Sequence, residues 1–246
     1  MFRFVLIHGA YHGGWCWRKI VDVLCEQSVE ALAPTLTGLG ERSHLLTGDV
    51  NLSTHITDIV QVLKFEDLHD VVLVGHSYAG MVISGVAEII PERIAHLVYL
   101  DALVPLDGQT VLDILPGVES RAKEITLAGR KIKVITPPTP QAFGVDDPAD
   151  VAWVAPRLTP MPYKCYAEPI KITNVATANI PKTYLICDIQ LGGDLRQSHE
   201  SAFERAKEAG WSYKRLAGPH DIMVTHPREL VDILLEIPGS SLRNCN

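Results

Sequence analysis

Several features are missing from this 246-residue chain, and each absence excludes a class of protein. No run of lysine and arginine occurs and the formal net charge is −7, which argues against nucleic acid binding, because that binding needs a basic face to neutralise phosphates. No uninterrupted apolar stretch reaches the roughly 18 residues of a membrane-spanning helix. Both the Gly-x-Gly-x-x-Gly pattern and the Walker lysine of phosphate-binding loops are also absent. These absences leave an acidic protein that acts on a small molecule.

Cysteine is scarce and scattered along the chain. The five cysteines form no Cys-x-x-Cys pair and no metal-like spacing, which argues against a disulfide framework and against a metal site. The N-terminal segment 2–7 has the pattern of a strand rather than of a signal peptide. We therefore expect reduced cysteines, no metal and a cytoplasmic location.

Strand-like and helix-like segments alternate through the first hundred residues. This alternation predicts an α/β protein with a mostly parallel sheet, and right-handed crossovers make that sheet doubly wound. The expected strands are 2–7, 30–33, 71–74, 96–100, 182–187 and 212–216. The expected helices are 17–27, 54–64, 78–90, 198–209 and 227–236, several of them ending near a proline or glycine as helices often do.

The alternation stops between about residues 105 and 178, where prolines interrupt the chain repeatedly. No internal repeat or low-complexity tract marks this stretch as separate. At this length a single core is sufficient. We predict one domain over residues 1–246 with an inserted cap over about 105–178.

Residues 71–80 combine a buried strand with a tight turn around a serine. The run Val-Val-Leu-Val-Gly-His-Ser-Tyr-Ala-Gly places Ser77 between small residues. A Gly-x-Ser-x-Gly elbow needs small residues, because its strand-to-helix turn leaves little room for side chains. Here Ala79 takes the fifth place, with Gly80 directly behind it. The pattern predicts a nucleophile, Ser77, exposed at the end of the strand.

A serine hydroxyl needs a base, a group that orients the base, and donors for the developing oxyanion. His220, in the run Gly218-Pro219-His220-Asp221, follows the last expected strand and is the predicted base. The oxyanion donors are expected to be the N–H groups of Ala10, in the loop His8-Gly9-Ala10, and of Tyr78. A nucleophile that precedes the histidine in the chain is the order found in α/β-hydrolases.

Three carboxylates compete for the role of the acid that orients His220. Asp101 ends one expected strand, whereas Asp188 and Asp194 lie around the end of the next, whose usual acid position holds Gln190 or Leu191. Both strand ends are close to the imidazole in such a sheet. We favour Asp101 and keep Asp188 and Asp194 as alternatives.

Aromatic residues near these motifs are candidates for a substrate pocket. Tyr11 and His12 are well placed beside the oxyanion loop, and Trp153 is a third candidate from the expected cap. Residues of this kind more often belong simply to the core, and Tyr11 and His12 are the better placed candidates. Further candidates are the aromatic Trp15, Trp17, Phe143 and Tyr163 and the apolar Met161.

Four motifs together resemble the plant methylesterase and hydroxynitrile lyase family of α/β-hydrolases, and most of all its bacterial esterase branch. The likeness covers nearly the whole chain. The motifs are His8-Gly9-Ala10-Tyr11-His12-Gly13-Gly14-Trp15-Cys16-Trp17, Pro34-Thr35-Leu36-Thr37-Gly38-Leu39-Gly40-Glu41-Arg42, Gly75-His76-Ser77-Tyr78 and Gly218-Pro219-His220-Asp221. The resemblance implies a cofactor-free serine hydrolase with a cap.

At several motif positions this chain has other residues than members of the resembled family, and these differences argue against one of the family's activities. The lyase members have a threonine and a lysine where this chain has Ala10 and Asp221, so cyanohydrin cleavage lacks its proton-handling groups here. The plant members have an aspartate where this chain has about Gln190. Bacterial relatives with Val-Tyr-Leu-Asp at the preceding strand favour Asp101.

The resulting hypothesis is a serine hydrolase that cleaves small carboxylic esters through a Ser-His-Asp triad and an acyl-enzyme. Alternatives are a carbamate or amide hydrolase on aromatic compounds with the same triad, a hydroxynitrile lyase, and a non-catalytic ligand-binding protein. The expected partners are a small ester substrate and, at most, a second copy of the chain in a homodimer. Neither nucleic acid nor a membrane is expected as a partner.

Overall fold

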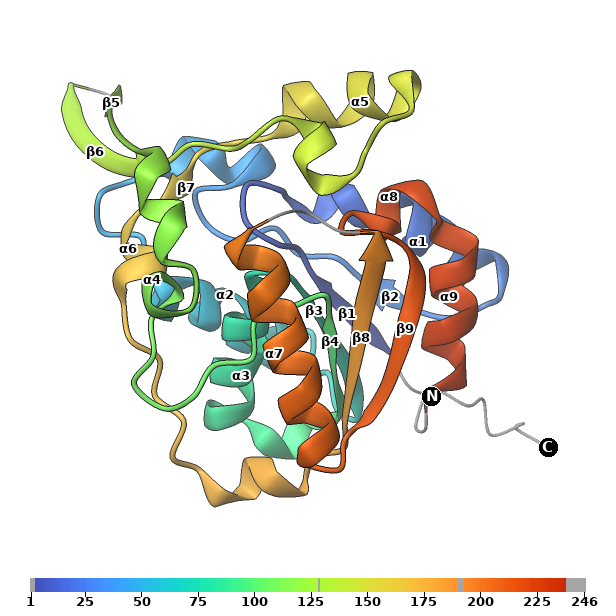
Figure 1. Ribbon diagram of the computed structural model, residues 1–246. Coiled ribbons are helices and arrows are strands. Elements are labelled where there is room, and N and C mark those ends of the chain that lie inside the picture. The colour runs from blue at the N-terminus through green and yellow to red at the C-terminus, as the bar shows by residue number, and fades with distance from the viewer. Residues whose placement is uncertain (1–2, 128, 190–192, 238–246) are drawn as a thin grey trace.

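A six-stranded sheet forms the centre of the protein (Figure 1). The computed structural model describes residues 3–127, 129–189 and 193–237. The strand order in the described chain is β2-β1-β3-β4-β8-β9, and all neighbouring strands are parallel. The strands are β1 (Phe4–Ile7), β2 (Ala31–Leu32), β3 (Val71–His76), β4 (Ile94–Leu100), β8 (Lys182–Ile189) and β9 (Ser212–Pro219). The prediction of a doubly wound parallel sheet is confirmed, because the chain runs from β1 outward to β2 and then returns to β3 on the other side.

Helices cover both faces of this sheet (Figure 1). On one face α1 packs against α9, and on the other α2 packs against α3, with α7 beside β8 and β9. These helices are α1 (Arg18–Glu26), α2 (Leu52–Phe65), α3 (Ala79–Ile89), α7 (Asp194–Glu208) and α9 (Pro227–Glu236), and a short α8 (Ile222–Thr225) precedes α9. The helix α2 begins two residues before the predicted start, because Asn51 and Thr54 form a capping box that satisfies free N–H groups there.

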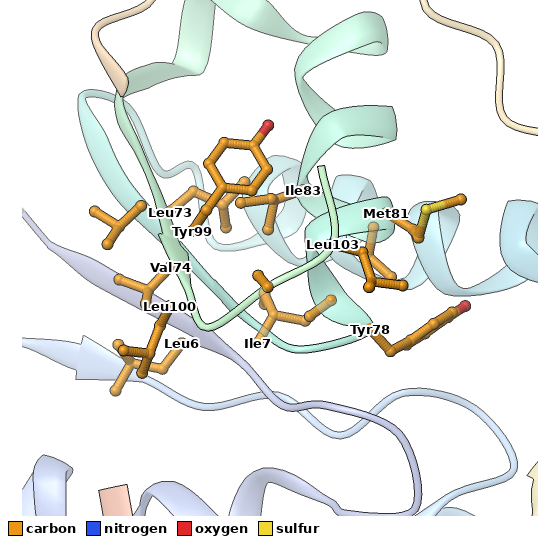
Figure 2. Packing of buried hydrophobic residues seen from close by; sticks show 14 of the residues in the cluster. Leu6, Ile7, Leu73, Val74, Tyr78, Met81, Ile83, Tyr99, Leu100 and Leu103 are labelled. Atoms are coloured by element: carbon orange, nitrogen blue, oxygen red, sulfur yellow. The ribbon is translucent and has the colours of Figure 1, made fainter. Parts of the chain in front are cut away.

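The core lies where the central strands meet α3. Every residue of β3 is buried, as expected for a strand covered on both faces. Figure 2 shows Leu73 and Val74 of β3 together with Leu100 of β4 and Ile83 of α3 in one apolar cluster. This packing fixes the ends of β3 and β4, from which the next loops begin.

The turn after β3 is as tight as the elbow pattern predicts. A Cβ at Gly75 would lie 2.8 Å from the carbonyl oxygen of Ala79, and a Cβ at Gly80 would lie 1.9 Å from that of Leu103. Neither approach is tolerated by a side chain, because both obstacles are backbone atoms. The residue between them, Ser77, has a φ of 55°, a left-handed conformation that is strained for serine.

Gly80→Ala is therefore expected to destabilise the fold. We expect the free energy of unfolding to fall by about 3 kcal/mol or more, the upper part of the range for overpacking. Gly48→Ala is the matched control, because no atom lies within 4 Å of the Cβ it would add. Urea unfolding of both variants measures this difference, and equal midpoints would contradict the described turn.

The chain between β4 and β8 leaves the main sheet and forms a second, antiparallel sheet of order β5-β6-β7. Its strands are β5 (Ala122–Leu127), β6 (Arg130–Ile135) and β7 (Met161–Pro162), and its helices are α4 (Val111–Ile114), α5 (Pro148–Val154) and α6 (Lys164–Ala167). Short 3-10 helices are interspersed at η4 (Pro116–Arg121), η5 (Pro140–Phe143), η6 (Ala155–Arg157) and η7 (Val175–Asn179). Figure 1 shows β5, β6 and α5 beyond the end of the main sheet toward which the β8 arrow points. We call residues 105–178 the cap segment.

The remaining 3-10 helices lie in the first hundred residues. They are η1 (Gly14–Trp17), η2 (Gly40–Leu45) and η3 (Pro91–Arg93). Among the helices of the described ranges, none combines the length and the apolar character that crossing a membrane requires.

Candidate active site

Ser77 lies between β3 and α3, at the carboxyl end of a central strand. Its N–H donates to the carbonyl of Leu100 at 3.2 Å, and its own carbonyl accepts from the N–H of Leu103 at 3.0 Å. Gly9 lies directly against it, since a Cβ at Gly9 would be 2.9 Å from the Cβ of Ser77. The loop after β1 and the loop after β3 are thus in contact around the serine. They lie at the switch point of the parallel sheet, where β2 lies on one side of β1 and β3 on the other.

His220 and Asp101 form a short, buried hydrogen bond. His220 follows β9, Asp101 follows β4, and His220 Nδ1 donates to Asp101 Oδ2 at 2.6 Å. Both side chains are almost completely buried. Because Nδ1 carries the proton, Nε2 is the basic nitrogen of the ring, and no protein group of the described residues hydrogen-bonds to it.

The other carboxylate candidates lie elsewhere. Asp188 is about half exposed and pairs with Arg215 at 3.3 Å. Asp194 is the first residue of α7, and its side chain lies outside what the structure describes, as do Gln190 and Leu191. Of the side chains that are described, Asp101 is the carboxylate bonded to the His220 ring.

Asp101 is held in place by a second histidine and by two backbone bonds. Its Oδ1 accepts from the N–H of Cys187 at 3.1 Å, and its own N–H donates to the carbonyl of Leu185 at 2.6 Å. Oδ2 also lies 3.4 Å from Nδ1 of His199, a buried residue of α7 whose ring stacks on that of His220. Burial alone would raise the pKa of Asp101, but His199 and His220 outweigh it and hold the pKa well below the usual carboxyl range. The carboxylate is therefore charged at neutral pH.

Ala10 and Tyr78, the predicted oxyanion donors, lie in the loop after β1 and at the turn after β3, and both line the cavity beside Ser77. Tyr78 directly follows Ser77 and precedes the first residue of α3, and Ala10 lies in the loop after β1. In the described chain neither N–H donates to a protein acceptor, so both are available to a ligand. The Tyr78 ring is buried with its hydroxyl 3.1 Å from His55 Nδ1, which fixes the turn.

A buried ion pair that sequence reasoning missed links the oxyanion loop to the His220 loop. His12 Nε2 donates to Asp221 Oδ2 at 3.0 Å, and its Nδ1 donates to the carbonyl of Ala10 at 2.8 Å. Burial opposes the charge on His12, but Asp221 outweighs it and raises the pKa of His12. His76 completes the link, because its Nε2 donates to the carbonyl of His220 at 2.9 Å.

Three buried, neutral histidines around the site predict how stability depends on pH. Burial lowers the pKa of His8 to about 3 and that of His55 to about 4, and it holds the pKa of His76 well below its ordinary 6.5. Below pH 6.5 the unfolded chain takes up protons that the folded chain refuses. Each of the three then removes about 1.4 kcal/mol of stability per pH unit until its folded pKa is reached. His12 adds no slope there, because its raised pKa keeps it protonated in both states.

Urea unfolding at pH 7, 6 and 5 checks this dependence. We expect the free energy of unfolding to fall steadily as the pH falls from 6.5 to about 4. The same unfolding midpoint at pH 7 and pH 5 would contradict the assignment of these histidines as neutral.

A cavity of about 350 Å³ opens beside Ser77 and His220. Its floor comes from the loops after β1 and β3, and its roof from the cap segment. Tyr11 and His12, both predicted for the pocket, line it, as do Phe143 and the unpredicted Arg121 and Tyr166. Its apolar wall is formed by Leu103, Val111, Leu115, Val118 and Leu195.

Most of the other aromatic candidates lie away from the cavity. Trp153 packs edge-on against Trp15, with ring centres 5.2 Å apart, and the side chains of Lys19 and Arg157 lie over its ring. It is not among the lining residues of the cavity, so the structure does not bring it to the serine. The same holds for Trp15, Trp17, Met161 and Tyr163.

Two groups of buried side chains have potential ligand atoms within 4.8 Å of one another, and such a cluster can hold a metal ion. The groups are His76, His220 and Asp221, and Asp101, His199 and His220. In both groups the side chains already bond to protein partners, His220 to Asp101 and Asp221 to His12. These bonds use His220 Nδ1, Asp101 Oδ2 and Asp221 Oδ2. The buried atoms His76 Nδ1, His199 Nε2 and Asp221 Oδ1 make no hydrogen bond within the described residues.

Comparison with known proteins gives matches over nearly the whole chain. A family profile described as "Alpha/beta hydrolase family" matches residues 4–233. A carbendazim hydrolyzing esterase of Nocardioides sp. (strain SG-4G) is 36% identical over 243 residues, covering 95% of this chain and 98% of that protein. The putative chloroplastic methylesterase 11 of Arabidopsis thaliana is 34% identical over 113 residues, covering 46% of this chain and 29% of that protein.

Solved structures agree in fold. An extracellular alpha/beta-hydrolase from a Paenibacillus species aligns with a TM-score of 0.76 at 23% sequence identity, covering 96% of this chain and 98% of that one. At 23% identity this similarity shows a shared fold and no more.

Proposed function

This chain is a carboxylic ester hydrolase that belongs to the alpha/beta hydrolase family, and from that premise we propose that it cleaves small esters through a Ser77-His220-Asp101 triad and an acyl-enzyme. The observation that carries the proposal is the buried 2.6 Å bond between His220 Nδ1 and Asp101 Oδ2. It orients the imidazole and selects the tautomer whose Nε2 is able to accept a proton.

The first half of the reaction forms the acyl-enzyme. Ser77 Oγ attacks the ester carbonyl carbon while its proton passes to His220 Nε2. The N–H groups of Ala10 and Tyr78 stabilise the oxyanion, each lowering the activation barrier by about 3 kcal/mol. As the carbon–oxygen bond of the ester breaks, His220 returns the proton to the departing alcohol.

Water completes the cycle by the same route. His220 Nε2 takes a proton from water as the oxygen of that water attacks the acyl carbon. The bond from that carbon to Ser77 Oγ breaks, and the proton returns to Oγ. Asp101 stays ionised throughout and stabilises the imidazolium.

A specific relative supports a second substrate class. The Nocardioides protein is a carbendazim hydrolyzing esterase, so carbendazim and simple aryl carbamates belong in the substrate panel. Ser77, His220 and Asp101 would act on carboxylic esters and on carbamates by the same steps. Comparing kcat/KM for the two substrate classes shows which one the enzyme prefers.

We also propose a cytoplasmic location for this enzyme. Cys16, Cys25 and Cys165 are free thiols, which supports a reducing compartment. Detection of the natural full-length protein in a cytosolic fraction tests this location, and its recovery in the culture medium would contradict it.

The test of the activity is the release of p-nitrophenol from p-nitrophenyl acetate and butyrate by the purified protein. We expect saturable turnover that EDTA leaves unchanged, because the proposed steps need no metal. No release from any ester of the panel by folded protein would contradict the proposal. Release of cyanide from a cyanohydrin without ester turnover would favour the lyase alternative.

A further inference from the structure

Arg121 is a charged side chain in a cavity whose other charged lining residue, His12, is paired with Asp221. It ends η4 in the cap segment and lines the cavity beside Ser77. No other lysine or arginine, and no aspartate or glutamate, lines this cavity among the described residues. The nearby charge on His12 is matched by Asp221.

The charge of Arg121 has no carboxylate partner in the part of the chain that the structure describes. Its side chain makes one hydrogen bond, from Nη2 to the hydroxyl of Tyr11 at 3.0 Å. The guanidinium also lies over the Tyr11 ring, 5.4 Å from its centre. A guanidinium has five N–H donors, so most of them remain available to a ligand.

Tyr11 fixes Arg121 relative to the oxyanion loop. Tyr11 directly follows Ala10, and its carbonyl accepts from the N–H of Thr159 at 2.9 Å. Its ring is buried, and the hydroxyl of Tyr166 lies 3.4 Å from its own. The guanidinium is therefore held by a rigid aromatic residue whose backbone begins next to the predicted oxyanion donor.

We propose that Arg121 binds a carboxylate of the substrate, so that the preferred esters carry a free carboxylate at the end remote from the scissile carbonyl. A guanidinium fork matches a carboxylate with two parallel hydrogen bonds, and the half-buried position of Arg121 strengthens them relative to bonds made in open water. The apolar wall formed by Val111, Leu115 and Val118 accommodates the carbon chain between the two ends. This inference rests on the proposed ester hydrolysis and names its substrate class.

The alternative is that Arg121 only ties the cap segment to Tyr11. A purely structural role would make its loss equally harmful to charged and neutral esters. The two roles are therefore separated by comparing substrates that differ only in the carboxylate.

The test measures kcat/KM for mono-p-nitrophenyl adipate and for p-nitrophenyl hexanoate, which have the same acyl length. We expect the wild type to prefer the adipate. Arg121→Gln should lower kcat/KM for the adipate by about 10- to 100-fold, mainly through KM, and change that for the hexanoate less than threefold. Arg121→Lys should restore part of the preference, and raising the salt concentration should weaken it.

Arg157→Gln is the matched control, because this arginine of the cap segment lies over Trp153 and does not line the cavity. It should leave both esters unaffected. Two outcomes would overturn the role of Arg121 and leave the proposed function standing. One is hydrolysis of both esters by the wild type without a preference, and the other is an equal loss of kcat/KM for both esters in Arg121→Gln. Hydrolysis of p-nitrophenyl acetate or butyrate but of neither six-carbon ester would also overturn the role of Arg121. Hydrolysis of none of the four esters would instead contradict the proposed function, and the inference with it.

Discussion

Ser77→Ala is expected to lower kcat for p-nitrophenyl butyrate on the order of 10⁴-fold or more. The alanine removes the oxygen that we propose becomes acylated, while the proposed oxyanion donors, the N–H groups of Ala10 and Tyr78, remain. Because the elbow backbone is determined by Gly75 and Gly80 rather than by the hydroxyl, the variant should fold normally. Initial rates and a thermal melt of the same preparation check both parts of this prediction.

Ser84→Ala is the control for this experiment. Ser84 lies on α3 behind the elbow. Its hydroxyl donates to the carbonyl of Gly80 at 2.7 Å and lies 2.9 Å from the hydroxyl of Tyr99. Ser84 does not line the cavity, so the turnover of Ser84→Ala should stay within a few-fold of the wild-type value. Turnover that survives in Ser77→Ala would mean that another group, or none, forms the covalent intermediate.

Asp101→Asn is expected to lower kcat by about 10³- to 10⁴-fold at pH 7. The asparagine keeps the shape but no longer accepts as a carboxylate from His220 Nδ1, so the imidazole loses its orientation and its tautomer. His199 loses the same negative neighbour, 3.4 Å away. The loss should appear in kcat with little change in KM, because Asp101 does not line the cavity.

Asp188→Asn separates this role from a general loss of negative charge. Asp188 bonds to Arg215 at the surface, so its variant should keep near-full turnover. Asp194→Asn tests the third carboxylate of the sequence in the same assay. Near-full turnover in Asp101→Asn together with a large loss in either of the others would move the acid to that residue.

The parallel sheet and its order of motifs could be predicted from the sequence because each depends on local patterns. Apolar runs identified β3 and β4, and Pro227 marked the start of α9 at its observed position. The antiparallel hairpin of β5 and β6 could not be recognised in the same way. β5 is largely exposed and lacks the alternation that identifies a half-buried strand. In β6 the alternation is confined to the short run Lys131, Ile132, Lys133 and Val134.

The placement of site residues could be predicted only where a strand end determined it. Ser77, His220 and Asp101 each directly follow a strand of the same parallel sheet. The carboxyl ends of these strands lie at one edge of the sheet, so the three residues come together there. His199 comes from α7 and Arg121 from the cap segment, and no local sequence pattern indicates that either residue lies near Ser77 and His220. Their contacts depend on tertiary packing, which one sequence does not reveal.

Trp153 illustrates the opposite error. An aromatic residue in a cap is a reasonable candidate for substrate contact, but Trp153 packs against Trp15 and beneath two cations instead. Large aromatic side chains bury much apolar area wherever they pack, so their presence alone does not locate a pocket. Phe143, by contrast, lines the cavity because η5 lies against the His220 loop, where its carbonyl accepts from the N–H of Asp221 at 3.1 Å.

The central claim is that Ser77 is a nucleophile activated by His220, and covalent trapping tests it most directly. The protein is incubated with a fluorophosphonate probe, digested and analysed by peptide mass spectrometry, with His220→Ala treated in parallel. The account predicts one adduct per chain, on the peptide that contains Ser77, and strongly slowed labelling in His220→Ala. An adduct on another residue, or ester turnover by protein that the probe does not label, would contradict it.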